Sequence, residues 1–494
     1  MNIKKVKKDI VSNGDLRKGY VFLCLITILA MIFFAFNNSP LVERMGEDGG
    51  MYLLMGRNIT EGGVLYRDLF DHKGPIIFFL NALPQLFIKG PLGVWILEVI
   101  FMAICLCLLY KMAYKLLKNK SAFIPPILYL FISCSLFNGG NYTEEYSNLF
   151  CIVALYIFVN WIESIERDIS NRQSLILGVS LAVVFFTRPN NIAIILCVMV
   201  YLFISILKKS SKKVLLYVTF CMIGIGIVSG IIMFYHIMQG TVNDMLYATI
   251  FHNMNYCREG FKEIQANHFI LSTFRKWLLF IYAIIVYAII KCLRNKDKKY
   301  AYFLIFSSIV ILLSILISGR EYKYYLLLAT PIMALSFMLM FVHGSKELNR
   351  YLKKSWRNVV IFILILFGLD IFLFVNPVKI KENINHYKEA SVELGSYIPK
   401  SDCDKVFGYD VPAMWYYLTK ITPCYKYYTM QEWMAKTNPD IKENINEFVL
   451  KERPTWIITY DEAAGTNHEL MDDILKNYKL IYKNQAGYLY RLNS

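Results

Sequence analysis

The stretch Tyr20–Phe36, YVFLCLITILAMIFFAF, decides the class of fold because it is apolar throughout and has no charged residue. The residues before it, Met1–Lys18, are basic, and the run contains no small-residue cleavage site of the kind that ends a signal peptide. A membrane-spanning helix needs about 20 mainly apolar residues. We therefore predict a first spanning helix here, preceded by a cytoplasmic segment 1–19.

The composition of the whole chain indicates the same class. Of its 494 residues, 56% are hydrophobic and only 18% are charged, whereas soluble proteins carry about 25% charged residues. So large an apolar excess does not fit inside a soluble core. It predicts a polytopic membrane protein and excludes a disordered chain, a coiled coil and a small disulfide-stapled domain. The 11 cysteines show no CxxC or Cys/His spacing, so we assign no metal site from them.

Apolar runs of spanning length recur along the chain. We predict eleven spans, at 20–36, 91–114, 122–138, 146–163, 173–187, 190–207, 214–236, 270–291, 300–318, 324–343 and 357–375. Ile76–Ile88 is also apolar, but it is too short to span and contains Pro84. We assign it as a helix that lies at the membrane surface or re-enters the membrane.

The distribution of charge orients these spans. With the N-terminus inside, every predicted inner segment is basic and most acidic residues fall on outer segments, as the positive-inside rule requires. The same bias accounts for the net charge of +16 without a nucleic-acid partner. We therefore expect a multi-pass plasma-membrane protein with a cytoplasmic N-terminus. Its membrane domain covers 20–377 and carries long outer loops at 37–75 and 237–268.

The tail from 378 to 494 differs in composition and reads as an extracytoplasmic α/β domain. Strands are predicted at 405–409, 424–429, 456–460, 480–483 and 488–492, and helices at 383–397, 411–418, 440–451 and 467–477. The alternation of strands and helices predicts a small, mostly parallel sheet that ends in a hairpin. Cys403 and Cys424 both lie in this domain, and the sequence leaves open whether they form a disulfide.

The first outer loop concentrates ionisable and aromatic groups next to the membrane. Its candidate site residues are Glu47, Asp48, Tyr52, Tyr66, Asp68, Asp71, His72 and Lys73. The simplest alternative is a solvated loop whose charges serve solubility. The loop is punctuated by glycine, alternates acid with base and runs directly into the predicted surface helix, and these features favour a functional site.

Two further clusters lie on the same predicted face. Glu144 and Glu145 are adjacent at a helix start, where they could also serve the helix dipole. The basic and aromatic residues are Arg188, Arg320, Tyr322 and Lys323. Arginine and lysine bind phosphate oxygens, although at helix ends such residues also anchor a protein in the interface.

Together these clusters place carboxylates and basic groups on one face of a membrane. That arrangement suits a lipid-linked sugar phosphate, whose tail lies in the bilayer and whose headgroup lies at the surface. Sugar transfer from such a donor needs a carboxylate base for an acceptor hydroxyl group and positive charge where the phosphate departs.

The motifs resemble those of a known family. They are Asp48-x-x-x-Tyr52, the Gly-x-x-Tyr-x-Asp stretch Gly63–Asp68, and Asp71-His72-Lys73-Gly-Pro75 leading into a short helix. Weaker similarities lie at Gly139–Glu145 and Gly319–Tyr325. The sequence resembles the GT-C membrane glycosyltransferases, in particular the bacterial glycosyltransferase 39 group related to protein O-mannosyltransferases and lipid A aminoarabinose transferases. The resemblance covers roughly residues 20–345.

The resemblance implies an inverting transfer from a polyprenyl-phosphate sugar to an extracytoplasmic acceptor. It implies that Asp48, with Glu47, is catalytic, that Asp48 is the base, and that the other candidate residues bind substrate. The chain departs from the family in having Glu47-Asp48-Gly49 where an Asp-Glu pair is common, and Leu97-Glu98 where many relatives have an arginine. Some relatives use a divalent metal and others do not.

Two other classes of function remain open at this stage. One is a flippase or transporter of lipid-linked glycans, which should carry ionisable groups near the midplane and repeated halves. The other is an inactive assembly partner in cell-surface polymer synthesis. The charges cluster at one interface and no internal repeat is visible, which favours the enzyme. The sequence leaves open the sugar and the acceptor, which could be a protein, a glycolipid, teichoic acid or capsule.

Overall fold

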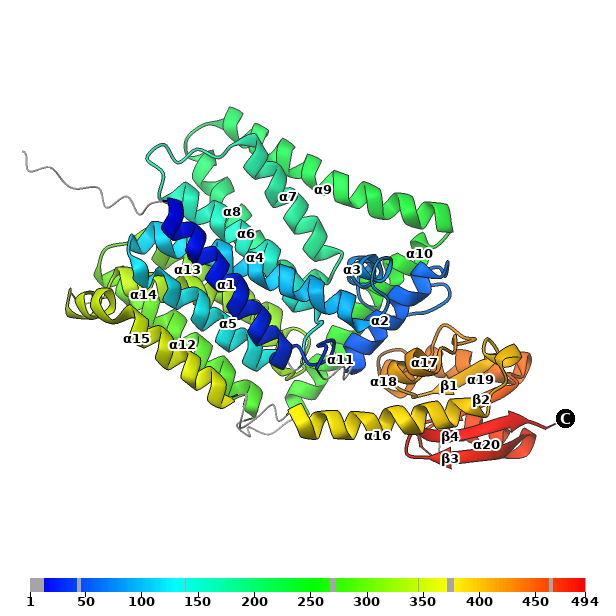
Figure 1. Cartoon of the computed structure of the whole chain (residues 1–494). Coiled ribbons are helices and arrows are strands. Elements are labelled where there is room, and N and C mark those ends of the chain that lie inside the picture. The colour runs from blue at the N-terminus through cyan, green and yellow to red at the C-terminus, as the bar shows by residue number, and fades with distance from the viewer. Residues whose placement is uncertain are drawn as a thin grey trace, which may run out of the picture.

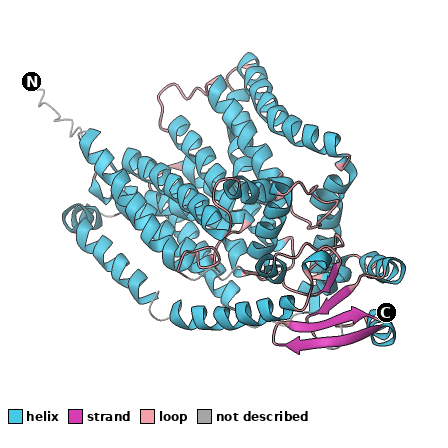
Figure 2. Ribbon diagram, turned by 45° about the vertical axis from the view of Figure 1, so that its right-hand side comes forward, coloured by secondary structure: helices cyan, strands magenta, loops and turns pink. Residues whose placement is uncertain are grey.

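The protein is described by a computed structural model, which covers residues 13–41, 46–137, 139–266, 272–344, 346–370, 377–461 and 465–493. Most of the chain is a bundle of long helices, and a smaller domain that contains the only sheet in the described residues lies against one end of the bundle (Figure 1). Figure 2 shows the same division by colour, with all strands gathered in the smaller domain.

Eight helical segments are long and apolar enough to cross a membrane. They are Leu16–Phe34 in α1 (Asn13–Phe34), α4 (Pro91–Leu117), α6 (Thr143–Ile162), Pro189–Leu207 with α8 (Ala193–Leu207), α9 (Ser211–Gln239), α12 (Thr273–Arg294), α13 (Lys298–Leu316) and Lys323–Val342 with α14 (Thr330–Val342). Each coincides with one of the eleven predicted spans. The chain is a multi-pass membrane protein.

The other three predicted spans have a different form. The runs at 122–138 and 173–187 are shorter apolar helices, Lys120–Leu136, which contains α5 (Ile124–Leu136), and α7 (Asn171–Phe185). The last run begins within α15 (Lys346–Asp370) and continues into residues outside the described part of the chain. The backbones of α7 and α9 approach each other closely at Gly178. A Cβ atom at this position would lie only 2.0 Å from the carbonyl oxygen of Cys221 in α9, so the contact requires glycine.

The first long loop folds into helices that bring its polar residues back toward the bundle. α2 (Glu47–Thr60) and α3 (Pro75–Gln85) pack on each other, and α3 is the short helix with an internal Pro84 that the sequence predicted at 76–88. The second long loop forms α10 (Val242–Leu246), a π-helical turn at Tyr247–Phe251 and α11 (His252–Ala266).

The C-terminal domain is a mixed sheet with helices. Its elements are α16 (Pro377–Ser396), β1 (Val406–Tyr409), α17 (Ala413–Thr419), α18 (Gln431–Thr437), α19 (Asp440–Glu452), β2 (Trp456–Thr459), α20 (His468–Asn477), β3 (Tyr478–Asn484) and β4 (Gly487–Leu492). The strand order is β1-β2-β4-β3. Only β1 and β2 pair in parallel, so the prediction of a mostly parallel sheet is wrong. The β3–β4 hairpin inserts β4 beside β2, which makes both of its pairings antiparallel.

One further prediction for this domain is wrong, and one element was missed. The stretch 424–429 is not a strand, and the bridge between Val406 and Pro423 lies just before it. Its consecutive Tyr427 and Tyr428 are both buried, which is not the alternation of a strand with one buried face. α18 was not predicted. Cys403 and Cys424 are free thiols, which answers the question of a disulfide that the sequence left open.

The C-terminal domain is bonded to the first loop. Arg57 of α2 donates to the carbonyl oxygens of Tyr417 (3.3 Å) and Ile421 (3.2 Å). The amide of Phe70 donates to the carbonyl oxygen of Lys426 (2.9 Å). These hydrogen bonds hold the domain at the end of the bundle where the predicted site residues gather.

Candidate active site

A cavity of about 310 Å³ lies where the first loop, the start of the Lys323–Val342 segment and the C-terminal domain meet. Five of the predicted site residues line it: Asp48, Asp71, His72, Lys73 and Tyr322. The rest of its wall is mainly aromatic and thioether side chains, Tyr142, Tyr256, Tyr324, Tyr325, Trp433, Met51, Met430 and Met434, together with Asn37 and Gly46. Polar groups on an aromatic surface are typical of ligand pockets.

Asp48 lies in the first turn of α2, one residue after the helix begins. Its carboxylate is half-buried and accepts a hydrogen bond from Tyr324 Oη at 3.3 Å. A helix N-terminus carries partial positive charge, which favours a carboxylate in this place. Tyr324 is itself held by a stacked Tyr142, with ring centroids 4.1 Å apart. Asp48 is therefore a preorganised carboxylate at the edge of the cavity.

Asp71, His72 and Lys73 form a buried charged cluster just before α3. His72 Nδ1 lies 2.9 Å from Asp71 Oδ1, and Lys73 Nζ lies 3.6 Å from Asp71 Oδ2. Burial by itself would raise the pKa of Asp71, but Lys73 and His72 outweigh it and hold that pKa well below its usual range. Burial, reinforced by Lys73, lowers the pKa of His72. The cluster thus contains a carboxylate, a neutral imidazole and an ammonium group.

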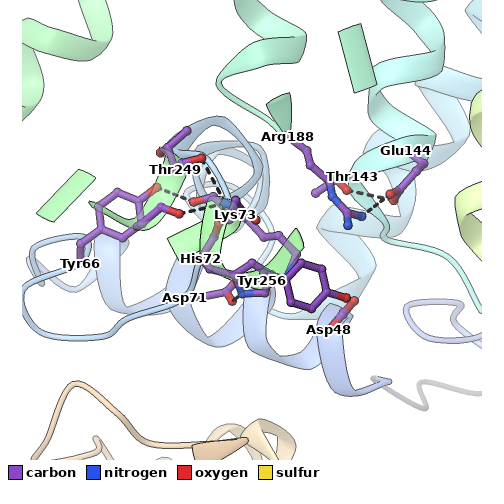
Figure 3. Close-up of polar contacts among 12 residues, drawn as sticks. Asp48, Tyr66, Asp71, His72, Lys73, Thr143, Glu144, Arg188, Thr249 and Tyr256 are labelled. Carbon is purple, nitrogen blue, oxygen red and sulfur yellow. Dashed lines mark hydrogen bonds and ion pairs between the residues drawn. The ribbon is translucent and has the colours of Figure 1, made fainter. Parts of the chain in front are cut away.

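The side of the cavity next to His72 is aromatic. The His72 ring lies 5.2 Å from both His252 and Trp433, measured between ring centroids, and 5.8 Å from Tyr256. Trp433 belongs to α18, so the C-terminal domain contributes to the cavity wall. Sequence reasoning missed Trp433, because no pattern in the tail indicates which of its side chains reaches the first loop. In Figure 3, His72 and Asp71 lie beside Tyr256, with Asp48 on the far side of that ring.

Arg188 and Glu144 form a buried ion pair behind the cavity (Figure 3). Arg188 Nη2 also donates to Tyr325 Oη at 2.9 Å, and its guanidinium carbon lies 4.4 Å from the centre of the Tyr325 ring. Tyr325 lines the cavity and its hydroxyl group lies 3.3 Å from that of Tyr256. The basic group predicted at Arg188 therefore reaches the cavity wall through a tyrosine.

Glu145 takes part in a different network. Its Oε2 accepts from the amide of Asn141 at 3.0 Å, and Glu98 accepts from the same amide and from Asn38. Glu98 is the residue at the place where many relatives have an arginine. Both carboxylates are buried and hold the turn before α6. This geometry favours a structural role for Glu145.

Three aromatic or acidic residues of the first loop shape it rather than line the cavity. Tyr66 is buried and donates to the carbonyl oxygen of Lys73 at 2.7 Å, which positions the charged cluster. Asp68 accepts from the amide of Val64 at 2.7 Å and from Arg67 at 2.9 Å. Tyr52 is buried with its ring 5.7 Å from Lys73 Nζ.

The remaining predicted residues, at positions 320–323, lie in or beside the wall of the cavity. The guanidinium carbon of Arg320 is 5.7 Å from the centre of the Tyr256 ring, so Arg320 contacts a cavity residue without being part of the lining found among the described residues. Tyr322 stacks on Tyr324 at 5.5 Å. Lys323 begins the helical turn Lys323–Ala329, which follows Tyr322 and carries Tyr324 and Tyr325 to the cavity.

Glu47, the other predicted catalytic residue, begins α2, but its side chain lies outside the described part of the structure. Within the described residues, no group of three or more His, Cys, Asp or Glu side chains could hold a metal ion.

Comparison with solved structures identifies the class of fold. The chain is similar to ArnT from Cupriavidus metallidurans in the apo state, with a TM-score of 0.62 at 10% identity, over 96% of this chain and 98% of that one. It is also similar to the same protein bound to undecaprenyl phosphate, with a TM-score of 0.57 at 10% identity and the same coverage. The chain therefore has the fold of these ArnT structures, in agreement with the class of fold that its first-loop motifs predicted.

A family model places the chain more narrowly. The model for the competence-induced protein Ccs4 N-terminal domain matches residues 12–376, and the chain belongs to this family. The match covers the membrane helices and both long loops but not the C-terminal domain. No curated protein matches the sequence.

Proposed function

We propose that this protein is a membrane glycosyltransferase that moves a sugar, of hexose or mannose type, from a polyprenyl-phosphate donor to an extracytoplasmic hydroxyl group. The observation that carries the proposal is that Asp48 and Lys73 line one cavity at the end of the membrane bundle. One residue can accept a proton and the other can neutralise a phosphate. The similar ArnT structure that holds undecaprenyl phosphate supports a donor of this kind.

In the proposed reaction, Asp48 takes the proton of an acceptor hydroxyl group as its oxygen bonds to the anomeric carbon of the sugar. The bond from that carbon to the phosphate oxygen breaks, and its electron pair stays on the polyprenyl phosphate. Attack opposite the leaving phosphate inverts the anomeric carbon. Asp71 is a poor base for this step because Lys73 and His72 hold its pKa well below the usual range.

Lys73 is the cation that we propose for the phosphate, since its side chain lines the cavity. Arg188 acts behind it through Tyr325, whose hydroxyl group it orients. Positive charge and oriented donors at a departing phosphate stabilise the transition state more than the ground state. Tyr52 and Tyr66 support the proposed phosphate site by packing on Lys73 or bonding its backbone.

An apolar cavity of about 330 Å³ suits the lipid part of the donor. Leu128, Phe131, Trp277, Phe280 and Phe337 line most of it, and they belong to α5, α12 and α14. An isoprenoid chain is bound by apolar area of this kind. We propose that the cavity holding Asp48 faces outside the cell and that the N-terminus is cytoplasmic, as the charge bias predicts.

A transfer assay tests the proposal. Purified protein in nanodiscs receives radiolabelled polyprenyl-phosphate sugars and a membrane extract as the acceptor source. We expect label to leave the lipid with wild type but not with Asp48→Asn. Glu61→Gln is the matched control, because Glu61 follows the opposite end of α2 and its side chain is 61% exposed. Equal transfer by Asp48→Asn and wild type would remove Asp48 from the reaction. Lipid movement across vesicles without transfer would indicate a flippase instead.

A further inference from the structure

A second cavity, of about 280 Å³, lies within the C-terminal domain. It shares Met430 and Trp433 with the cavity that holds Asp48. These two side chains are thus the wall between the cavities, with one face toward the proposed reaction site and the other toward the C-terminal domain. A molecule long enough to pass this wall would contact both cavities.

The second cavity lies where the two parallel strands end. Asp410 follows β1 directly, and Tyr460 follows β2 directly. The register pairs Tyr409 with Thr459, which puts Asp410 and Tyr460 at the same edge. The cavity therefore lies outside the carboxyl ends of the parallel pair, the edge at which open α/β sheets bind their ligands.

The two acidic side chains of this cavity are held in fixed positions. Asp410 Oδ1 accepts from the amide of Glu432 at 3.1 Å, and the amide of Asp410 donates to Gln431 Oε1 at 2.7 Å. The Glu432 carboxylate accepts from Tyr409 Oη at 2.8 Å and from the amide of Thr466 at 2.8 Å. Fixed carboxylates each offer several acceptor sites for hydroxyl groups.

The rest of the cavity combines aromatic rings with a few polar groups. Trp433 lies on one side and Tyr460, which is 52% exposed, lies on another, while Lys436 and Thr429 complete the polar lining. A sugar ring has an apolar C–H face and a rim of hydroxyl groups. Aromatic rings bind the first and carboxylates bind the second.

We infer that the second cavity is an acceptor subsite for a glycan without negative charge, which extends past Trp433 to present its terminal hydroxyl group to Asp48. This inference rests on the proposed glycosyltransferase function and adds the chemical class of the acceptor. Two carboxylates against one lysine give the cavity net negative charge, so a phosphate-rich polymer such as teichoic acid is disfavoured by repulsion.

Kinetics with two readouts test the inference. Wild type, Tyr460→Ala and Asp410→Asn are assayed in nanodiscs with a labelled polyprenyl-phosphate sugar and defined acceptors. The acceptors are uncharged oligosaccharides of glucose, galactose, mannose and N-acetylglucosamine, and a glycerol-phosphate polymer. Release of sugar to water is measured in parallel. We expect Tyr460→Ala to raise the acceptor KM by about tenfold, the scale of one lost ring contact, and Asp410→Asn to raise it by about tenfold, the scale of one lost hydrogen bond to a charged group. Both variants should leave release to water unchanged.

A matched control and a binding measurement separate the possible failures. Tyr397→Ala removes a tyrosine of the same domain that is 42% exposed and lies outside the linings of both cavities as the described residues define them, so its acceptor KM should equal that of wild type. Binding of the uncharged oligosaccharides to the full-length protein is followed by calorimetry, which needs no transfer.

Each outcome decides between the two ideas. Wild type that binds an oligosaccharide but consumes no donor would contradict the proposed function and leave the subsite standing if Tyr460→Ala weakens binding. Unchanged acceptor KM and unchanged oligosaccharide binding in both variants would overturn the subsite while transfer continues. Preferred use of the glycerol-phosphate polymer would overturn the assigned class of acceptor.

Discussion

Asp48 and Asp71 line the same cavity but sit in opposite environments. Asp48 is half-buried at a helix N-terminus and accepts a hydrogen bond from Tyr324. Asp71 is fully buried between His72 and Lys73, which lower its pKa. The difference separates two uses of a carboxylate. One can accept a proton from a ligand, and the other holds a cation in position.

The largest effect should come from Asp48, the less buried of these two carboxylates. Asp48→Asn should reduce transfer by about 10²–10⁴-fold, the usual contribution of a general base, and should leave the thermal midpoint of the purified protein unchanged. The rate of label release, measured beside the melting curve, tests this. A melting point that drops along with the rate would mean that Asp48, like Asp71, serves the fold.

Asp71→Asn, in contrast, should lower the stability of the protein. It leaves the Lys73 ammonium buried without its carboxylate, and breaking a buried pair in this way costs about 3–5 kcal/mol. We expect a lower thermal midpoint in detergent. The double variant Asp71→Asn/Lys73→Met should recover part of that loss, because it removes the stranded charge. No recovery in the double variant would show that the pair does not stabilise the protein.

Arg320→Ala should have a smaller effect, confined to the substrate. Its guanidinium group packs on Tyr256, a contact worth about 0.5–1 kcal/mol at an exposed site and about 2 kcal/mol when desolvated. Because Tyr256 lines the cavity, we expect the apparent KM for the donor to rise by several-fold, with a loss of stability no larger than the energy of this one contact. An unchanged donor KM would assign Arg320 to anchoring at the membrane surface.

The last effect is a dependence of stability on pH from the Asp71 side of the cavity, which accumulates gradually over several pH units. Burial, reinforced by His72 and Lys73 and opposed by Asp71, lowers the pKa of His252 to about 3. Unfolded, this histidine binds a proton below about pH 6.5. Between these values the unfolded state holds more protons, so acidification destabilises the protein, by about 1.4 kcal/mol per pH unit at most.

His252→Gln tests this dependence. The variant should flatten the fall of the thermal midpoint between pH 6.5 and pH 4, measured by differential scanning fluorimetry. The Asp71 carboxylate contributes little in this window, since a carboxylate with a lowered pKa loses its stabilising effect as the pH falls toward that lower value. His72, whose pKa is also lowered by burial, accounts for part of the slope that remains in the variant. A slope equal to that of wild type would show that another group titrates there.

Much of the membrane domain could be predicted because apolar length and loop charge are local properties. Eight spans and the short helix α3 follow from them directly. The shorter helix α7 packs against the backbone of α9 at Gly178. Hydropathy describes each segment separately, so it does not predict such a contact between two segments. In the tail, Tyr425 and Tyr427 alternate as in a strand, but the structure buries the consecutive Tyr427 and Tyr428 in a loop, so alternation over so short a stretch does not establish a strand.

The candidate site was predictable in parts but not as an arrangement. Motifs placed Asp48 and the Asp71–Lys73 cluster in one loop, and the structure brings them to one cavity. The pairing of Arg188 with Glu144 joins two helix starts that no local pattern connects. Trp433 is separated from His72 by most of the chain, and only the docking of the C-terminal domain reveals their contact.

The wall made by Met430 and Trp433 has a consequence for the synthesis of the protein. The ribosome makes Asp48 early and Trp433 late, yet the two residues line one cavity. During translation the membrane helices assemble first. The cavity beside Asp48 is therefore incomplete until the C-terminal domain folds. Donor lipid bound at that stage would meet water in place of Trp433. Chains that stop before α18 would therefore keep their membrane helices but lack Trp433, and with it part of the wall of the Asp48 cavity.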